Sequence, residues 1–89
     1  GLLFKVQIAT STNKVKPIPE NFKGLEDVEF YEAGGLFRYT YGSEKTWEAA
    51  NELQKKVKES GYEDSFVVAF HNGKRMAVGE AVKLLKEDK

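Results

Sequence analysis

A tight turn at Gly34 and Gly35 is the feature that most constrains the fold of this chain. The runs VEFYEA (28–33) and LFRYTYG (36–42) flank the turn, and both are rich in the aromatic and β-branched residues typical of strands. Two adjacent glycines supply the positive φ angles that a two-residue hairpin loop requires. The sequence therefore predicts a β-hairpin over residues 28–42.

Two further strands and a helix are predicted on either side of this hairpin. LFKVQIAT (3–10) alternates apolar and polar residues, as a half-buried strand does. TWEAANELQKKVKESG has an apolar stripe at helical spacing that includes Trp47, with Thr46 as N-cap and Gly61 as C-terminal stop. SFVVAF (65–70) is a continuous apolar strand, followed by the hairpin signal Asn72-Gly73, a short edge strand and a helix from residue 77 onward.

The segment between the first strand and the hairpin carries Pro17 and Pro19, which exclude a long helix. A single helical turn is predicted to begin at Pro19 and to end at Gly24. Phe22 and Leu25 would be the core contacts of this turn.

This order of elements predicts one α+β domain over residues 1–89 with the split β-α-β-β-α-β (ferredoxin- or RNP-like) pattern. Its sheet would have four antiparallel strands, with the first and third in the centre and the helices on one face. The first crossover helix would be reduced to a loop or short turn, and an extra helix would follow at the C-terminus. The other face of the sheet would be open.

Composition and motifs argue against several classes of function. Lys and Arg equal Asp and Glu at 14 each, so the basic excess usual in nucleic-acid-binding proteins is absent. The chain has no cysteine, no phosphate-binding glycine motif and no apolar run of the ~20 residues that span a membrane. His71, the single histidine, has no recognisable catalytic partners. We therefore expect neither an enzyme nor a cofactor or metal site.

The open face of the predicted sheet is the remaining candidate for function. Alternation points eight side chains away from the helices: Lys5, Gln7, Ala9, Glu29, Tyr31, Leu36, Arg38 and Thr40. Gln7 and Arg38, on the two central strands, would form an array of donors and one acceptor suited to a polyhydroxylated, amide-bearing ligand. The alternative is an ordinary solvated face. The pattern also leaves open whether Phe66, Val68 and Phe70 or Val67 and Ala69 face the helices.

Several of these stretches together resemble a SPOR domain, the sporulation-related repeat of bacterial cell-envelope proteins. The resemblance covers residues 3–70 and rests on FKVQIAT, GGLFRYTYG, WEAANELQKKVKESGY and DSFVVAF in that order. The tail over residues 71–89 is similar to the extension of SPOR-like domains in the Bacteroidetes group.

The resemblance implies a non-catalytic domain that binds septal peptidoglycan and prefers glycan strands from which amidases have removed the stem peptides. Such a domain brings a parent protein to the division site, in the periplasm or cell envelope, as part of a longer exported chain. The parent would be a wall hydrolase, such as an N-acetylmuramoyl-L-alanine amidase, or a division protein. Partners would be glycan strands and other cell-division proteins, and not nucleic acid.

The resemblance also implies a set of ligand-binding residues. By motif position it selects Gln7, Thr10, Leu36, Arg38 and Phe66, and it favours the orientation with Phe66 on the open face. Leu36 stands where the family often has an aromatic residue, and Tyr31 on the neighbouring strand would compensate. The full predicted site is Gln7, Thr10, Tyr31, Leu36, Arg38, Thr40 and Phe66.

Two other functions use the same topology. One is a protein-interaction module that docks a partner on the open face. The other is an RNA-binding sheet of the RRM type, although Glu63 and Asp64 stand where that motif favours cations.

Overall fold

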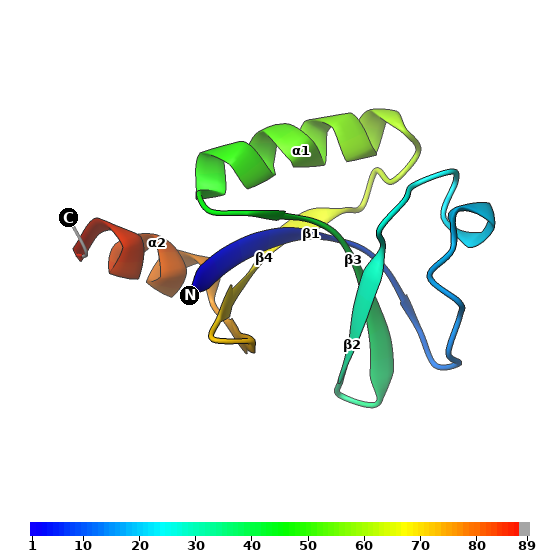
Figure 1. Cartoon of the computed structure of the whole chain (residues 1–89), viewed down its shortest axis with the longest axis horizontal. Coiled ribbons are helices and arrows are strands. Elements are labelled where there is room, and N and C mark those ends of the chain that lie inside the picture. Colours follow the sequence, from blue (N-terminus) through cyan, green and yellow to red (C-terminus); the bar gives the residue numbers. More distant parts are fainter. Residues whose placement is uncertain (88–89) are drawn as a thin grey trace.

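An antiparallel sheet of five strands, in the order β2-β3-β1-β4-β5, forms the frame of the α+β fold (Figure 1). The computed structural model describes residues 1–87, so positions 88 and 89 of the predicted C-terminal extension lie outside the described residues. The strands are β1 (Leu2–Ser11), β2 (Glu29–Ala33), β3 (Leu36–Glu44), β4 (Phe66–His71) and β5 (Lys74–Met76). The helices are the 3-10 helix η1 (Pro19–Asn21), α1 (Trp47–Glu59) and α2 (Val78–Glu87).

The short edge strand predicted after Asn72-Gly73 is confirmed as β5, and its pairing with β4 corrects the predicted sheet of four strands to five. Asn72 and Gly73, both at positive φ, turn the chain straight back, so that Lys74 pairs with His71 and Met76 with Ala69. The turn signal was present in the sequence, and β5 covers residues 69–71 of the β4 edge, which a four-stranded sheet would leave unpaired.

The predicted hairpin is confirmed. Ala33 pairs with Leu36 across a two-residue loop in which Gly34 and Gly35 have φ of +61° and +77°. Such angles suit glycine and are the reason that this turn falls at the glycine pair.

Helix α1 begins and ends where its caps predict. Thr46 Oγ1 accepts a hydrogen bond from the Ala49 amide at 3.2 Å, and Gly61 follows shortly after the last helical residue. Ala50 and Val57 are buried against the sheet. Trp47 was expected in this apolar stripe, but its position in the first turn leaves it 38% exposed.

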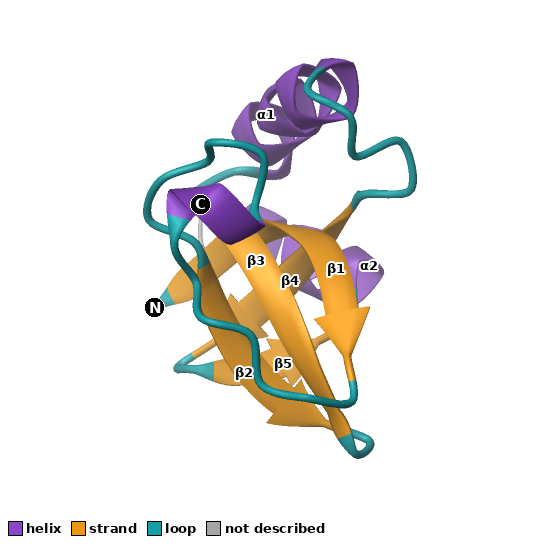
Figure 2. Cartoon of the chain, turned by 90° about the vertical axis from the view of Figure 1, so that its right-hand side faces the viewer, coloured by secondary structure: helices purple, strands orange, loops and turns teal. Residues whose placement is uncertain are grey.

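The proline-containing segment 12–28 forms a loop with a single 3-10 turn, as the two prolines predict. Phe22 is buried with its ring centroid 4.9 Å from that of Tyr39, and Leu25 packs on the same cluster. The Tyr39 hydroxyl accepts from the Val15 amide at 2.6 Å and donates to the Val15 carbonyl at 3.0 Å. In Figure 2 this segment crosses in front of β3. It therefore takes the place of a helix over one end of the sheet.

Two hydrophobic clusters lie on the side of the sheet that carries the helices, which we call the covered face. Phe4 and Ala69 from the sheet meet Ala50 of α1 and Ala81 of α2 in the first cluster. Tyr39 and Val28 meet Phe22 in the second. Both helices thus pack on one face, as expected, and the loop completes that layer.

The sheet curls strongly away from the helices. The Tyr31 and Phe70 rings, on β2 and β4, lie 5.1 Å apart although β3 and β1 separate these strands in the sheet. Figure 1 shows β1 arched beneath α1, with the two hairpins descending on either side. The face opposite the helices is therefore concave, which the sequence did not predict.

Candidate functional site

The concave face carries all seven residues predicted as a site. Side chains directly opposite each other in an antiparallel pair lie on the same face. Gln7 pairs with both Thr40 and Phe66, and Arg38 pairs with both Thr10 and Tyr31. Leu36 lies two residues before Arg38, so it points to the same face. Gln7 on β1 and Arg38 on β3 are diagonal neighbours, because Gln7 pairs with Thr40 and Arg38 with Thr10.

A β-bulge in β1 changes the facing of one residue. Gln7 pairs with Thr40 and Ala9 with Tyr39, so Ile8 is an extra residue in β1. Ala9 consequently joins Tyr39 on the covered face, whereas strict alternation had placed it on the open face. The same bulge brings Thr10 to the concave face beside Gln7, three positions later in the sequence.

The register of β4 decides which side of this apolar strand is buried against the helices. Val67 and Ala69 pair with Val6 and Phe4 and pack into the helix-side cluster. The orientation with Phe66 on the concave face is therefore confirmed. Phe66 is 45% exposed, slightly more than Ile18 and Trp47, the other exposed large apolar side chains of residues 1–87.

One part of the concave face, which we call the closed end, is filled by Lys5, Glu29, Tyr31 and Phe70. Lys5 Nζ lies 3.0 Å from Glu29 Oε1 and 5.3 Å from the centroid of the Phe70 ring. The Tyr31 hydroxyl donates to Gln7 Oε1 at 2.8 Å. These side chains meet because the sheet curls.

The closed end corrects the expectation of an openly solvated face. Gln7 and Thr40 are only 4% and 2% exposed, because the rings of the closed end lie over them. Thr40 forms part of the floor of the face, whereas the hydrogen-bonded Gln7 borders the accessible part.

The other part of the concave face, which we call the open end, consists of Thr10, Leu36, Arg38 and Phe66. Thr10 and Phe66 are exposed, and Leu36 and Arg38 are half-buried. A shallow hollow of about 210 Å³ lies here, lined by Gln7, Ile8, Ala9, Thr10, Asp64 and Phe66. Gln7 and Thr10 are thus next to an accessible aromatic ring. The Arg38 guanidinium lies nearer the β2–β3 turn, where it contacts Ala33.

Several of these donors have no acceptor within the part of the chain that the structure describes. Arg38 Nε donates to the Ala33 carbonyl at 3.2 Å, while its two terminal nitrogens have no protein partner in residues 1–87. Gln7 Nε2 likewise has none there, although Gln7 Oε1 is occupied by Tyr31. No described carboxylate lies at ion-pairing distance from Arg38. The open end therefore offers a guanidinium and an amide donor to a ligand rich in oxygen acceptors.

Arg75 on β5 belongs to the same face and was not predicted as a site residue. It pairs with Phe70, and its Nε donates to the Tyr31 hydroxyl at 3.3 Å. The Asn72-Gly73 turn, followed by alternation along the short strand, was the sequence signal that would have placed it there.

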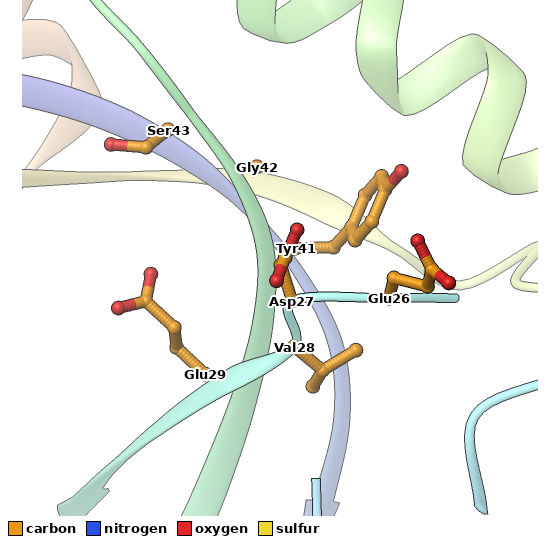
Figure 3. Close-up of a pocket in the computed structure, with 7 residues that line it drawn as sticks. All are labelled: Glu26, Asp27, Val28, Glu29, Tyr41, Gly42 and Ser43. Carbon is orange, nitrogen blue, oxygen red and sulfur yellow. The ribbon is translucent and has the colours of Figure 1, made fainter. Parts of the chain in front are cut away.

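A larger hollow, of about 600 Å³, lies elsewhere, beside the edge of β2 and β3. Its lining includes three carboxylates, those of Glu26, Asp27 and Glu29. Figure 3 shows Glu29 and Ser43 on one side of β3 and Glu26 and Tyr41 on the other, so the polar groups do not converge. We therefore place the candidate site on the concave face, where the polar groups do converge.

No group of three or more His, Cys, Asp or Glu side chains in residues 1–87 is arranged to hold a metal ion. Burial raises the pKa of the Tyr62 hydroxyl above its usual value, but Tyr62 follows α1 and stacks with Lys23, apart from the concave face. No helix in residues 1–87 has the length and apolar character needed to span a membrane.

The chain matches no family model, and neither curated proteins nor solved structures gave a significant match. Family and function therefore depend on the motif resemblance and on the chemistry of the concave face.

Proposed function

We propose that this domain is a SPOR-like, non-catalytic binding module for peptidoglycan glycan strands, with a preference for strands stripped of stem peptides. The fold proposed with it is the split β-α-β-β-α-β pattern. The antiparallel order β2-β3-β1-β4 supports this assignment, with β5 and α2 as additions and the loop 12–28 in place of the first crossover helix.

The observation that carries the proposal is the set of unpartnered donors on the same concave face as the exposed Phe66 ring. Gln7 Nε2 and the terminal nitrogens of Arg38 lack acceptors in residues 1–87, and Phe66 is 45% exposed. These donors are not among the buried unpartnered atoms, so they remain accessible to a ligand. Their presence on one face favours a ligand-binding role.

A glycan strand fits this chemistry. Hydroxyl and N-acetyl oxygens accept hydrogen bonds from the Gln7 amide, the Thr10 hydroxyl and the Arg38 guanidinium. The apolar face of a sugar ring packs against Phe66 and Leu36, as in sites that combine apolar walls with a few polar groups. The zero net charge of the chain provides no overall attraction to a polyanion, so recognition would depend on local contacts.

In the cell, we propose that the domain brings a parent wall hydrolase or division protein to the division septum. The parent would be exported, and the domain would act in the periplasm or cell envelope. Other division proteins are further candidate partners. Each of these statements derives from the resemblance to SPOR domains.

Co-sedimentation with peptidoglycan sacculi tests the proposal. We expect the purified domain to bind sacculi that an amidase has stripped of stem peptides more tightly than intact sacculi. Arg38→Ala should weaken binding to the stripped sacculi by about tenfold, because it removes charge-assisted hydrogen bonds. Lys58→Ala is the matched control, because it removes one exposed cation from α1, on the covered side of the sheet.

Binding to neither preparation would overturn the proposal, and the concave face would then be a candidate docking surface for a protein partner. Equal binding by Arg38→Ala and the wild-type domain would overturn the placement of the ligand at the open end.

A further inference from the structure

We propose that Arg75 is a further binding residue, and that it recognises a carboxylate on the ligand. This inference rests on the proposed function and deepens it, because it names a chemical group that the concave face selects. Arg75 lies on β5, outside the residues 3–70 that resemble the SPOR domain.

The hydrogen bonds around Tyr31 bring Arg75 to the site. Arg75 Nε donates to the Tyr31 hydroxyl at 3.3 Å, and that hydroxyl donates to Gln7 Oε1 at 2.8 Å. The three side chains come from β5, β2 and β1 and form a continuous series of hydrogen bonds across the concave face. A ligand that reaches the Gln7 amide therefore lies one side chain away from the Arg75 guanidinium.

The Arg75 guanidinium has N–H donors that form no hydrogen bond within residues 1–87. Of the five N–H donors of a guanidinium, one at Nε binds Tyr31 and one at Nη1 donates to the Met76 carbonyl at 2.8 Å, which leaves three. Arg75 is exposed, and no carboxylate in residues 1–87 lies at ion-pairing distance. Lys5, the neighbouring cation of the concave face, is by contrast paired with Glu29 at 3.0 Å.

Removal of a stem peptide creates the group that such a guanidinium binds best. Hydrolysis of an amide between a sugar substituent and a peptide adds water, releases the peptide amine and leaves a carboxylate on the sugar. Before cleavage the same position is a neutral amide. Guanidinium and carboxylate match in geometry and form two parallel hydrogen bonds. Arg75 would therefore contribute to a preference for stripped glycan over intact glycan.

The test compares Arg75→Ala with Lys74→Ala on stripped sacculi. Lys74 is on the same strand and carries the same charge, but it lies on the covered side of the sheet. It pairs with His71, which pairs with Leu2, and Leu2 packs in the helix-side cluster. We expect Arg75→Ala to lower affinity about tenfold and Lys74→Ala to leave it unchanged within about twofold. Both positions are exposed, so thermal unfolding should be the same for the two variants.

A second ligand separates a carboxylate contact from other effects of the substitution. Stripped sacculi whose carboxyl groups have been reduced to alcohols should bind the wild-type domain about tenfold more weakly, and Arg75→Ala should cause no further loss on them. An unchanged affinity of Arg75→Ala for stripped sacculi, or an equal loss on reduced sacculi, would overturn this inference alone. Failure of the wild-type domain to bind any sacculi would overturn the proposed function as well.

Discussion

The two ends of the concave face have similar types of side chain. These side chains contact one another at the closed end and are more accessible at the open end. At the closed end, Tyr31 and Phe70 pack edge to face with ring centroids 5.1 Å apart, and Lys5 is paired with Glu29. At the open end, Phe66 is exposed and Arg38 has no carboxylate partner in the described residues. Each end thus has an aromatic side chain and a cation. Only at the closed end does the aromatic ring pack on another ring and the cation pair with a carboxylate of the described residues.

The difference follows from the curl of the sheet. The β2–β3 and β4–β5 hairpins approach each other at the closed end, so the chain supplies its own ring and its own carboxylate there. At the open end no such segment of residues 1–87 lies opposite Phe66. Contacts within the closed end should therefore affect stability, and side chains at the open end should affect binding.

Phe70→Ala gives the largest expected effect, and it is on stability. Phe70 is 9% exposed and packs on Tyr31, so its truncation should lower the free energy of unfolding by about 3 kcal/mol. Chemical denaturation followed by circular dichroism measures this change. A loss below about 1 kcal/mol would mean that the closed end is not packed in solution.

Phe66→Ala, the counterpart at the open end, should change stability by about 1 kcal/mol or less, because Phe66 is 45% exposed. Its affinity for stripped sacculi should fall about tenfold through loss of a ring that packs on the sugar. The same denaturation and co-sedimentation assays measure both quantities. A large stability loss with unchanged affinity would reverse the assignment of the two ends.

Tyr31→Phe makes the finest comparison, because it keeps the ring on Phe70 and removes only the hydroxyl that links the closed end to Gln7. The free energy of unfolding should fall by about 1 kcal/mol, since Gln7 Oε1 loses its donor in a buried position. The NMR shifts of the Gln7 side-chain amide should move in the same variant. Unchanged shifts and stability would show that the Tyr31–Gln7 hydrogen bond is absent in solution.

Local features of the fold could be predicted from the sequence because local residues cause them. Gly34 and Gly35 determine the hairpin turn, Thr46 caps α1, and Pro17 and Pro19 exclude a long helix from the first crossover. Alternation correctly places Tyr31, Leu36, Arg38 and Thr40 on one face, because β2 and β3 are regularly paired. Thr10 shares that face with Gln7 only because of the bulge at Ile8. Their role in ligand binding stays a prediction.

The burial of the site could not be predicted in this way. The burial of Gln7 and Thr40 depends on the approach of Tyr31 and Phe70, which are 39 positions apart in sequence and on non-adjacent strands. The bulge at Ile8 has no glycine to mark it, so alternation alone placed Ala9 on the wrong face. Both features arise from long-range packing.

The extra residue at Ile8 has a consequence for how the concave face can change through insertions and deletions. Because the bulge adds one position to β1, removing Ile8 would leave Gln7 and Thr10 on the same face of a regular ladder. It would also remove a bend from β1, since bulges bend strands and increase their twist. A single-codon deletion would thereby keep the candidate site residues on one face and flatten the surface that holds them. The curvature of the concave face and the identity of its residues can therefore evolve separately.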